Sequence, residues 1–415
     1  MSRRSKKYLL AALEIGTNKI CMLVAEYDLA EGLRLLGVGQ SPSRGVLKGN
    51  IIHASLAQKD VQTALAQAEK MSREVIRRVT LNVAGPGLQF QHVHRSIPIH
   101  PPHRAIHAED INTLMHQVRS IQIPPDHRIL HFLQHRFFLD RGEPVDWPEG
   151  KPAEELGMEA TIVHMPSSLL EHRLHLMKAV ELEVTHLLPN GIATALSVTT
   201  GAHRQAGVLV IDIGGGTTDY ALFHQGKLLA VGSVPVGGNH VTLDLAAFLN
   251  IEIPYAEIYK KKYAYTILPP NPSDQIVEES LESQNRRIRF RLGSVRRVVE
   301  VRLEEIFQIV RELLAEQKLD YAYRSQGIIL AGGCARIEGI TQLAERVFGA
   351  PAQVGSIHGF PQLTEYQNLN QPEFATPFGL LLYMRNRIVT EGTYFKADRR
   401  GFWRRIWSTV RRRYA

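Results

Sequence analysis

Apolar and polar positions follow the same order in two distant parts of the chain. In the first part, apolar runs at 9–13 and 20–24 flank a short segment that contains Gly16 and Thr17. In the second, apolar runs at 208–213 and 220–223 flank a turn with three consecutive glycines. Each copy continues through a turn glycine into a third apolar run and then into a segment rich in Pro and Gly. Such runs, bounded by glycine, are typical of strands, so the sequence predicts two three-stranded meanders.

The glycine turns also suggest chemistry. Glycines between two strands let the backbone approach a ligand and direct several N–H groups at one anion, such as a phosphate. Asp212 stands at the edge of the second turn, where its carboxylate could hold Mg²⁺ through a water molecule. Gly332 and Gly333 follow another apolar run and could lie against a base or sugar. A plain glycine-rich turn explains each signal alone, but together they predict a nucleotide cleft between two halves of the molecule.

The residues that we expect to bind the nucleotide come from both halves. Lys19 could reach a phosphate or could equally be a lysine on the strand surface. The full set is Glu14, Gly16, Thr17, Asn18, Lys19, Asp212, Gly214, Gly215, Gly216, Thr217, Thr218, Gly238, Gly332, Gly333 and Arg336.

Apolar residues at helical spacing predict the helices. Ser167 is expected to cap a helix with Leu170, Leu174, Met177 and Val180 as its apolar stripe, and Asn239 to cap another. The apolar run at 160–165 is expected to return the chain to the core, and 201–207 to form a hinge. Further helices are expected at 55–72, 107–120, 192–198, 292–314, 337–348 and 376–387, and further strands at 78–84, 128–140 and 184–188.

Composition is that of an ordinary globular protein, with 44% apolar residues. Cys21 and Cys334 are the only cysteines and form no disulfide or zinc pattern, so a reducing cytoplasm is expected. No run has the length of a membrane span, and the basic start lacks the features of a signal peptide. The net charge is +8, but seven of those charges are arginines at 399–413. A nucleic-acid-binding face on the folded body is therefore not expected.

The C-terminal segment 399–415 has a pattern of its own, after a polar linker predicted at 388–398. Its large apolar residues fall on one side of a helix and arginines fill the other side, as in helices that lie in a membrane interface. An ordinary helix packed on the body is the alternative. The expected membrane residues are Phe402, Trp403, Ile406, Trp407 and Val410, with Arg404 and Arg405 on the polar face.

These motifs carry a resemblance. The order of Glu14–Thr17, Asp212–Thr218 and the two glycines at 332–333 is similar to the actin, heat-shock chaperone and sugar-kinase superfamily. The Ser-Arg-Gly segment at 43–45, the Ile-Glu-Gly segment at 337–339 and the basic tail resemble, more narrowly, the bacterial cell-division family FtsA. The resemblance extends over 9–387 and the tail. It implies an α/β, actin-like fold: duplicated ribonuclease H-like domains around a nucleotide cleft, with an inserted α+β subdomain and a C-terminal amphipathic helix.

The resemblance also implies a division into parts. The first actin-like half would comprise 8–85 and 159–205, interrupted by a family-specific insertion at 86–158. The second half would comprise 206–238 and 303–387, with a smaller subdomain at 239–302. In this family the smaller subdomain receives the C-terminal peptide of FtsZ, and Arg302 matches a family arginine linked to that contact, although the residues around it depart from the family pattern.

The function that the resemblance implies is that of a membrane-tethered, ATP-binding cell-division protein. With ATP and Mg²⁺ as cofactors, it would polymerise into an actin-like filament, anchor FtsZ filaments to the anionic cytoplasmic membrane, and recruit later division proteins. It would act on the cytoplasmic face of the bacterial inner membrane at the division site. No residue that activates water is evident, so the sequence leaves hydrolysis of ATP open. A sugar or small-molecule kinase of the same superfamily and an actin-like scaffold of pilus assembly are the alternatives.

Overall fold

Two five-stranded sheets with the same strand order form the body of the protein. The computed structural model describes residues 7–266, 275–281, 286–360, 363 and 366–397. The first sheet has the order β11-β6-β1-β2-β3 and the second the order β14-β13-β12-β17-β18. In both sheets the three strands of a meander are antiparallel, and the two remaining strands run parallel to the first strand of that meander. The duplicated α/β architecture predicted from the sequence is confirmed.

The strand bounds follow the predicted apolar runs. The first sheet contains β1 (Lys7–Ile15), β2 (Lys19–Asp28), β3 (Gly32–Pro42), β6 (Arg78–Val83) and β11 (Glu183–Pro189). The second contains β12 (Val208–Ile213), β13 (Thr218–His224), β14 (Lys227–Val234), β17 (Ile328–Ala331) and β18 (Ala352–Val354). A small hairpin, β4 (Val46–Leu47) and β5 (Asn50–Ile51), lies near the first meander.

Helices cover both faces of each sheet. On one face of the first sheet, Leu13 and Ile15 pack with α1 (Ala54–Ser72) and α3 (Ser167–Ala179). On the corresponding face of the second sheet, Leu209 and Ile211 pack with helices of the second half. Those helices are α6 (Gly238–Leu249), α7 (Ile253–Tyr263), α8 (Leu292–Glu316) and α9 (Ile340–Phe348). Alternate residues of a strand point to opposite faces, so the other face of each sheet is left for a separate core.

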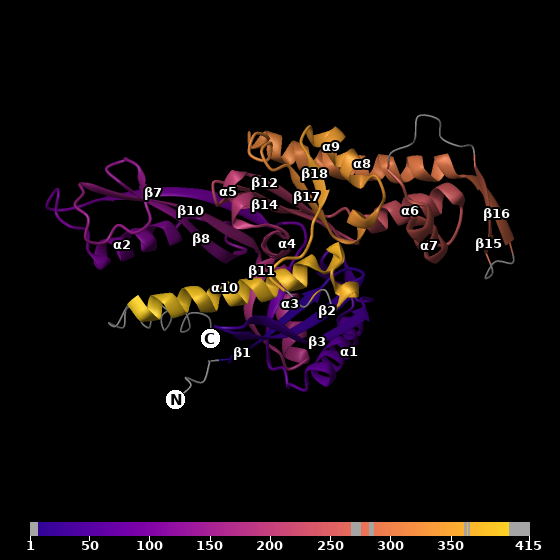
Figure 1. Ribbon diagram of the computed structural model, residues 1–415, viewed down its shortest axis with the longest axis horizontal. Coiled ribbons are helices and arrows are strands. Elements are labelled where there is room, and N and C mark those ends of the chain that lie inside the picture. Colours follow the sequence, from indigo (N-terminus) through magenta and orange to yellow (C-terminus); the bar gives the residue numbers. More distant parts are fainter. Residues whose placement is uncertain (1–6, 267–274, 282–285, 361–362, 364–365, 398–415) are drawn as a thin grey trace.

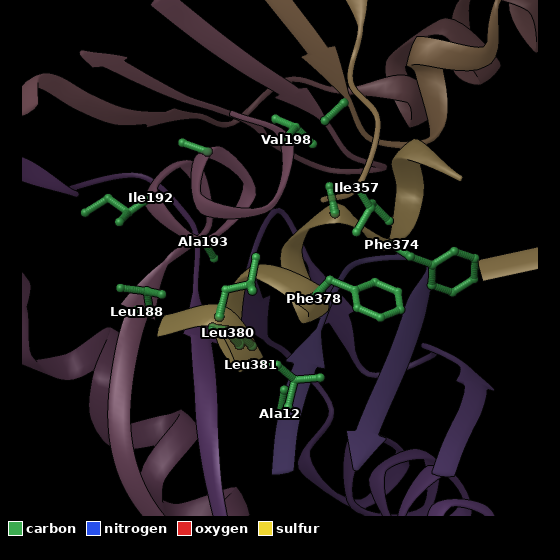
Figure 2. Packing of buried hydrophobic residues seen from close by; sticks show 14 of the residues in the cluster. Ala12, Leu188, Ile192, Ala193, Val198, Ile357, Phe374, Phe378, Leu380 and Leu381 are labelled. Atoms are coloured by element: carbon green, nitrogen blue, oxygen red, sulfur yellow. The ribbon is translucent and has the colours of Figure 1, made fainter. Parts of the chain in front are cut away.

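That separate core lies between the two sheets and is formed by two exchanged helices. α4 (Asn190–Val198) follows the last strand of the first sheet but packs on β12 and β13 of the second. α10 (Ala375–Ala397) follows the last strand of the second sheet but packs on β1, β2 and β6 of the first. Figure 2 shows Phe378, Leu380 and Leu381 of α10 in the cluster that contains Ala12 of the first sheet and Ala193 of α4. Each half is thus completed by a helix from the other.

An inserted subdomain projects from one side of the body (Figure 1). Its sheet has the order β7-β10-β8-β9, formed by β7 (Gln89–Pro98), β8 (His127–Leu139), β9 (Pro144–Val145) and β10 (Glu155–Pro166), with α2 (Ala108–Arg119) packed on β7 and β10. The segment predicted to return to the core at 160–165 does contribute Val163 and Met165 to the central cluster, but the boundary predicted at 158 is wrong. β10 pairs along its length with both β7 and β8, so the boundary would cut a strand in the middle of this sheet.

The remaining elements are short. They are the helix α5 (Gly201–Ala206), the hairpin of β15 (Ile276–Leu281) and β16 (Arg286–Arg291), and the 3₁₀ turns η2 (Gly333–Arg336), η4 (Gln367–Leu369) and η5 (Pro372–Phe374). The hairpin and α7 (Ile253–Tyr263) both lie in the region of the predicted smaller subdomain.

Several local predictions need correction. Ser167 is the first residue of α3 and makes no side-chain cap, because β10 runs directly into the helix at Pro166. Asn239 lies inside α6, which is preceded by Gly237. The segment predicted as a hinge forms α5, capped by the hydroxyl of Thr200, which accepts a hydrogen bond from the His203 N–H at 3.2 Å.

The predicted linker at 388–398 is also wrong over most of its length, because α10 continues to Ala397. The predicted membrane helix at 399–415 lies outside the described residues. In the described part of the chain, every helix is too short or too polar to cross a membrane.

Candidate functional site

A cavity of about 550 Å³ lies between the two halves, at the place predicted for the nucleotide cleft. Both glycine turns, the turn after β17 and residues of α6 and α7 line it. All the predicted nucleotide-binding residues line this cavity except Gly216 and Thr218. Gly216 faces Thr17 and Lys48 instead, and the Thr218 hydroxyl donates to the Val236 carbonyl at 2.8 Å. The fold therefore brings residues from distant parts of the chain to one place.

The two turns have the same hydrogen-bonded geometry. The Gly16 N–H donates to the Lys19 carbonyl and the Gly214 N–H donates to the Thr217 carbonyl, each at 2.9 Å. A Cβ atom on Gly215 would lie 2.5 Å from the Asn18 side chain. Glycine is therefore needed here because the two turns meet, and none of the three consecutive glycines has a positive φ. The close approach predicted toward a ligand is, in the structure, an approach to the facing turn.

The tips of these turns leave backbone donors available. Among the described residues, no acceptor receives the backbone N–H of Thr17, Asn18, Gly215 or Gly216. Buried or clustered N–H groups need an acceptor from solvent or ligand. Three of these residues, Thr17, Asn18 and Gly215, line the cavity. Several N–H groups directed at one place are the arrangement that binds a phosphate.

A reciprocal pair of side-chain amides joins the two halves beside the turns. Asn18 Nδ2 donates to Asn239 Oδ1 at 2.8 Å, and Asn239 Nδ2 donates to Asn18 Oδ1 at 2.9 Å. Asn18 belongs to the first turn and Asn239 to the start of α6. The pair links the two halves, so separating them at this point requires both hydrogen bonds to break.

Two carboxylates with little exposure to solvent, Glu14 and Asp212, line the cavity. The Glu14 carboxylate lies 3.3 Å from the Lys19 ammonium, which also donates to the Glu373 carbonyl at 2.6 Å. Asp212 Oδ2 accepts hydrogen bonds from the hydroxyls of Thr194, at 2.6 Å, and Thr376, at 2.9 Å. Burial raises the pKa of both Glu14 and Asp212, and Lys19 opposes this rise. Since a divalent cation favours ionised carboxylates, this pair fits the hydrated Mg²⁺ expected from the sequence.

A buried network behind the second turn was not predicted. Asp219 Oδ2 accepts from the Thr217 hydroxyl at 3.0 Å and from Asn190 Nδ2 at 3.1 Å. Asn82 Nδ2 in turn donates to Asn190 Oδ1 at 2.9 Å, and the Ile15 N–H donates to Asn82 Oδ1 at 2.7 Å. Burial is the main cause that raises the pKa of Asp219 to about 7. The sequence could have pointed to Asp219, because it places a carboxylate at the start of a strand whose following residues, Tyr220, Ala221 and Leu222, are buried.

The opposite wall of the cavity was predicted only in part. Gly332 has φ 81°, and a Cβ there would lie 2.5 Å from Asp212 Oδ1, so this position requires glycine. Arg336 lies at the wall and forms an ion pair with Glu373 at 3.0 Å. Glu257 and Lys260 of α7 also line the cavity, joined by an ion pair at 2.6 Å. No local sequence signal marks these two residues, since only the packing of α7 on α6 brings them to the cleft.

Arg302, on α8, does not line the cavity. Its guanidinium pairs with Asp244 of α6, with a distance of 2.9 Å from Nη2 to Oδ1, and with Glu305 one turn along the helix. Arg302 is partly exposed and already has acidic partners within the smaller subdomain.

Comparisons with known proteins agree with this architecture. The sequence model described as cell division protein FtsA matches residues 209–379, and that of the SHS2 domain inserted in FtsA matches 85–164. The chain is 32% identical over 393 residues to the cell division protein FtsA of Escherichia coli (strain K12), covering 92% of each chain.

Solved structures show the same fold at low sequence identity. The PilM-PilN type IV pilus biogenesis complex is similar with a TM-score of 0.63 and 18% identity, covering 90% of this chain and 98% of that one. MreB5 of Spiroplasma citri bound to ADP is similar with a TM-score of 0.54 and 15% identity, covering 91% and 96%. The actin-like fold class is thus confirmed. The match of the inserted subdomain, together with 32% identity to a relative that is covered over 92% of its length, shows that the chain belongs to the FtsA family of bacterial cell-division proteins.

Proposed function

We propose that this cell-division protein binds ATP with Mg²⁺ in the cleft between its halves and uses the bound state to assemble on the membrane. The observation that carries the proposal is the pair of equivalent turns whose free N–H groups lie beside one cavity. The N–H groups of Thr17, Asn18 and Gly215, which line the cavity, would bind phosphate oxygens. Glu14 and Asp212 would hold water bound to Mg²⁺, and the metal would neutralise phosphate charge.

The other site residues follow from their positions on the wall. Gly332 and Gly333 would lie against the adenosine, and Arg336 borders the same wall. Glu257 offers carboxylate oxygens that can accept hydrogen bonds from ribose hydroxyls. Thr218 and Gly216 would support the second turn from behind, since neither lines the cavity.

A nucleotide-binding measurement tests this site. We expect the full chain to bind ATP more tightly with Mg²⁺ than with EDTA. The substitution Asp212→Asn should remove most of that difference, because the neutral amide no longer favours hydrated Mg²⁺. Asp320→Asn, on a surface carboxylate paired with Arg324, is the matched control and should behave as the wild type. An unchanged Mg²⁺ dependence in Asp212→Asn would contradict the assignment.

We also propose that the smaller subdomain binds the C-terminal peptide of FtsZ beside Arg302. Leu243 and Val301 are the sequence neighbours of the Asp244–Arg302 ion pair, and they are 48% and 49% exposed. Apolar side chains next to an arginine are typical of the centre of a peptide-binding surface.

Peptide binding to variants of the full chain tests this surface. Val301→Asp and Arg302→Ala should each weaken binding of the FtsZ C-terminal peptide from the same genome by about tenfold or more, in the range of interface hot spots. Val75→Asp changes another exposed valine in the first half and should have no effect. Equal weakening by all three variants would place the peptide elsewhere.

Attachment to the anionic cytoplasmic membrane is proposed to depend on 399–415. Apolar residues such as Trp403 and Trp407 would enter the lipid interface, and Arg404 and Arg405 would face lipid headgroups. We expect the full chain to float with liposomes that contain anionic lipid. A chain that ends at Asp398 should stay in the dense fraction, separate from the liposomes. Flotation of both chains, or of neither, would contradict the proposal.

The remaining parts of the proposal concern assembly. The protein would form actin-like filaments on the cytoplasmic face of the inner membrane at the division site and recruit later division proteins. Electron microscopy of lipid monolayers with and without ATP tests the first of these, and we expect filaments only when nucleotide is present.

A further inference from the structure

Arg173 is a charged side chain enclosed in the first half of the molecule. It projects from α3, is 2% exposed, and is the largest fully buried side chain in the described residues. Its Nη2 donates to the Gly49 carbonyl at 2.7 Å and its Nη1 to the Asn82 carbonyl at 3.3 Å. Among the described residues, no carboxylate lies within the 4.0 Å of an ion pair with this guanidinium.

A buried arginine with only neutral partners is unusual. Arginine is almost never fully buried unless it is paired, because removing the charge from water is costly. Burial lowers the pKa of Arg173 to about 10, so the side chain remains charged at neutral pH. The carboxylate that interacts with it electrostatically is Asp219, whose own pKa is raised to about 7 by burial. The folded protein therefore leaves this positive charge incompletely neutralised.

The two carbonyls that accept from Arg173 belong to the wall of the cavity or lie directly behind it. Gly49 lines the cavity, and the preceding residue, Lys48, has its backbone N 2.9 Å from the position of a Cβ on Gly216. The side-chain oxygen of Asn82 accepts a hydrogen bond from the N–H of Ile15, the residue before the first turn. One residue, Gly49 or Asn82, therefore separates the Arg173 guanidinium from the cavity or from the strand that leads into the first turn.

We propose that Arg173 is a positioning residue for the polyphosphate: it supplies a fixed positive charge behind the turns, and the bound phosphates act as its missing counter-anion. A charge enclosed in protein is screened weakly by salt and acts over longer distances than a surface charge. The inference rests on the proposed binding of ATP in the cavity. It makes phosphate, rather than adenosine, the part of the ligand that depends on Arg173.

Competition with a fluorescent ATP analogue on the full chain tests the inference, since displacement also measures weak ligands. In Arg173→Gln, the charge is lost but an amide donor remains. We expect its affinity for ATP to fall about tenfold or more and its affinity for adenosine to stay within about twofold. Arg173→Lys, which keeps the charge, should retain most of the wild-type preference for ATP over adenosine.

Arg204→Gln is the matched control. Arg204 is partly buried, donates to the carbonyl and hydroxyl of Thr199, and does not line the cavity, so this variant should keep the wild-type preference. Equal losses of ATP and adenosine affinity in Arg173→Gln would mean a purely structural role and would overturn the inference, as would unchanged ATP affinity.

Two further outcomes are decisive. If Arg173→Gln does not fold, Arg173→Met is measured in the same way, because an apolar side chain of similar volume can replace a buried charge. If neither neutral variant folds, Arg173 is required for the fold itself and the inference fails. If the wild-type chain binds no ATP, it is the proposed function that fails, and this result is distinct from the others.

Discussion

The crossing of the two exchanged helices, α4 and α10, offers a direct test of how the fold supports the site. Gly379 of α10 lies against Ala193 of α4. A Cβ at position 379 would lie 3.0 Å from the Ala193 Cα atom, and the carbonyl group of Ala193 would be closer still. Carbon atoms in contact are normally about 3.5–4.0 Å apart. Gly379→Ala therefore forces the helices apart by roughly 1 Å or more, against backbone that has no side chain to rearrange.

The expected cost is the balance of two effects. Alanine in place of glycine in a helix interior stabilises by about 1 kcal/mol. Overpacking of this kind costs about 3 kcal/mol, at the upper end of the usual range, because the obstacle is backbone. The net loss is about 2 kcal/mol, which should lower the thermal midpoint by about 2 °C for a chain of this size if it unfolds as one unit.

The same substitution should weaken ATP binding. Thr376, one turn earlier on α10, donates to Asp212 at 2.9 Å, so movement of the helix changes the base of the cavity. Thermal unfolding and ATP titration of Gly379→Ala, with Gly201→Ala as control, measure both effects. Gly201 begins α5 and has open space where a Cβ would lie, so its variant should be neutral or slightly more stable. Wild-type stability in Gly379→Ala would refute the view that this helix crossing is rigid.

Three more outcomes are expected. Thr376→Val removes one of two hydroxyl donors to Asp212, and it should cost about 1–3 kcal/mol in the free energy of unfolding and reduce the effect of Mg²⁺ on ATP affinity. A double-mutant cycle of Asn18→Ala and Asn239→Ala should give a coupling energy of about 0.5–1.5 kcal/mol, and additive losses would show that the amide pair does not hold the halves together. Burial raises the pKa of Asp219 to about 7, so the folded state binds more protons than the unfolded state between the ordinary pKa of an aspartate and about 7. Its contribution to stability should therefore decrease as pH rises through that interval, and the slope of unfolding free energy against pH should become flatter in Asp219→Asn; an identical slope in the two proteins would contradict this.

The strands and turns of the two halves could be predicted because their signals are local. Strand alternation and the glycines of each turn lie within a few residues of each other, and the structure places both turns at one cavity. The reason for glycine at Gly215 could not be read locally, since it depends on Asn18 in the facing turn.

Other features depend on packing between distant elements. The apolar stripe predicted for α3 included Leu174, but the buried face of the helix contains Arg173 and Leu176 instead. A positive charge inside the core contradicts simple hydrophobic periodicity, so periodicity alone could not find it. Similarly, Lys260 reaches the cavity only because α7 folds back on α6. The polar sequence after 388 did not indicate that α10 continues to Ala397.

The exchange of α4 and α10 has a consequence for synthesis of the protein. Chains emerge from the ribosome amino-terminal end first, and early parts usually fold before later parts appear. Here the first sheet remains without one of its covering helices until residues 375–397 have been made. The cleft is therefore completed only after α10 has left the ribosome, and the segment at 399–415 follows within seconds. An incomplete chain released before that point lacks both a finished cleft and the segment proposed to reach the lipid.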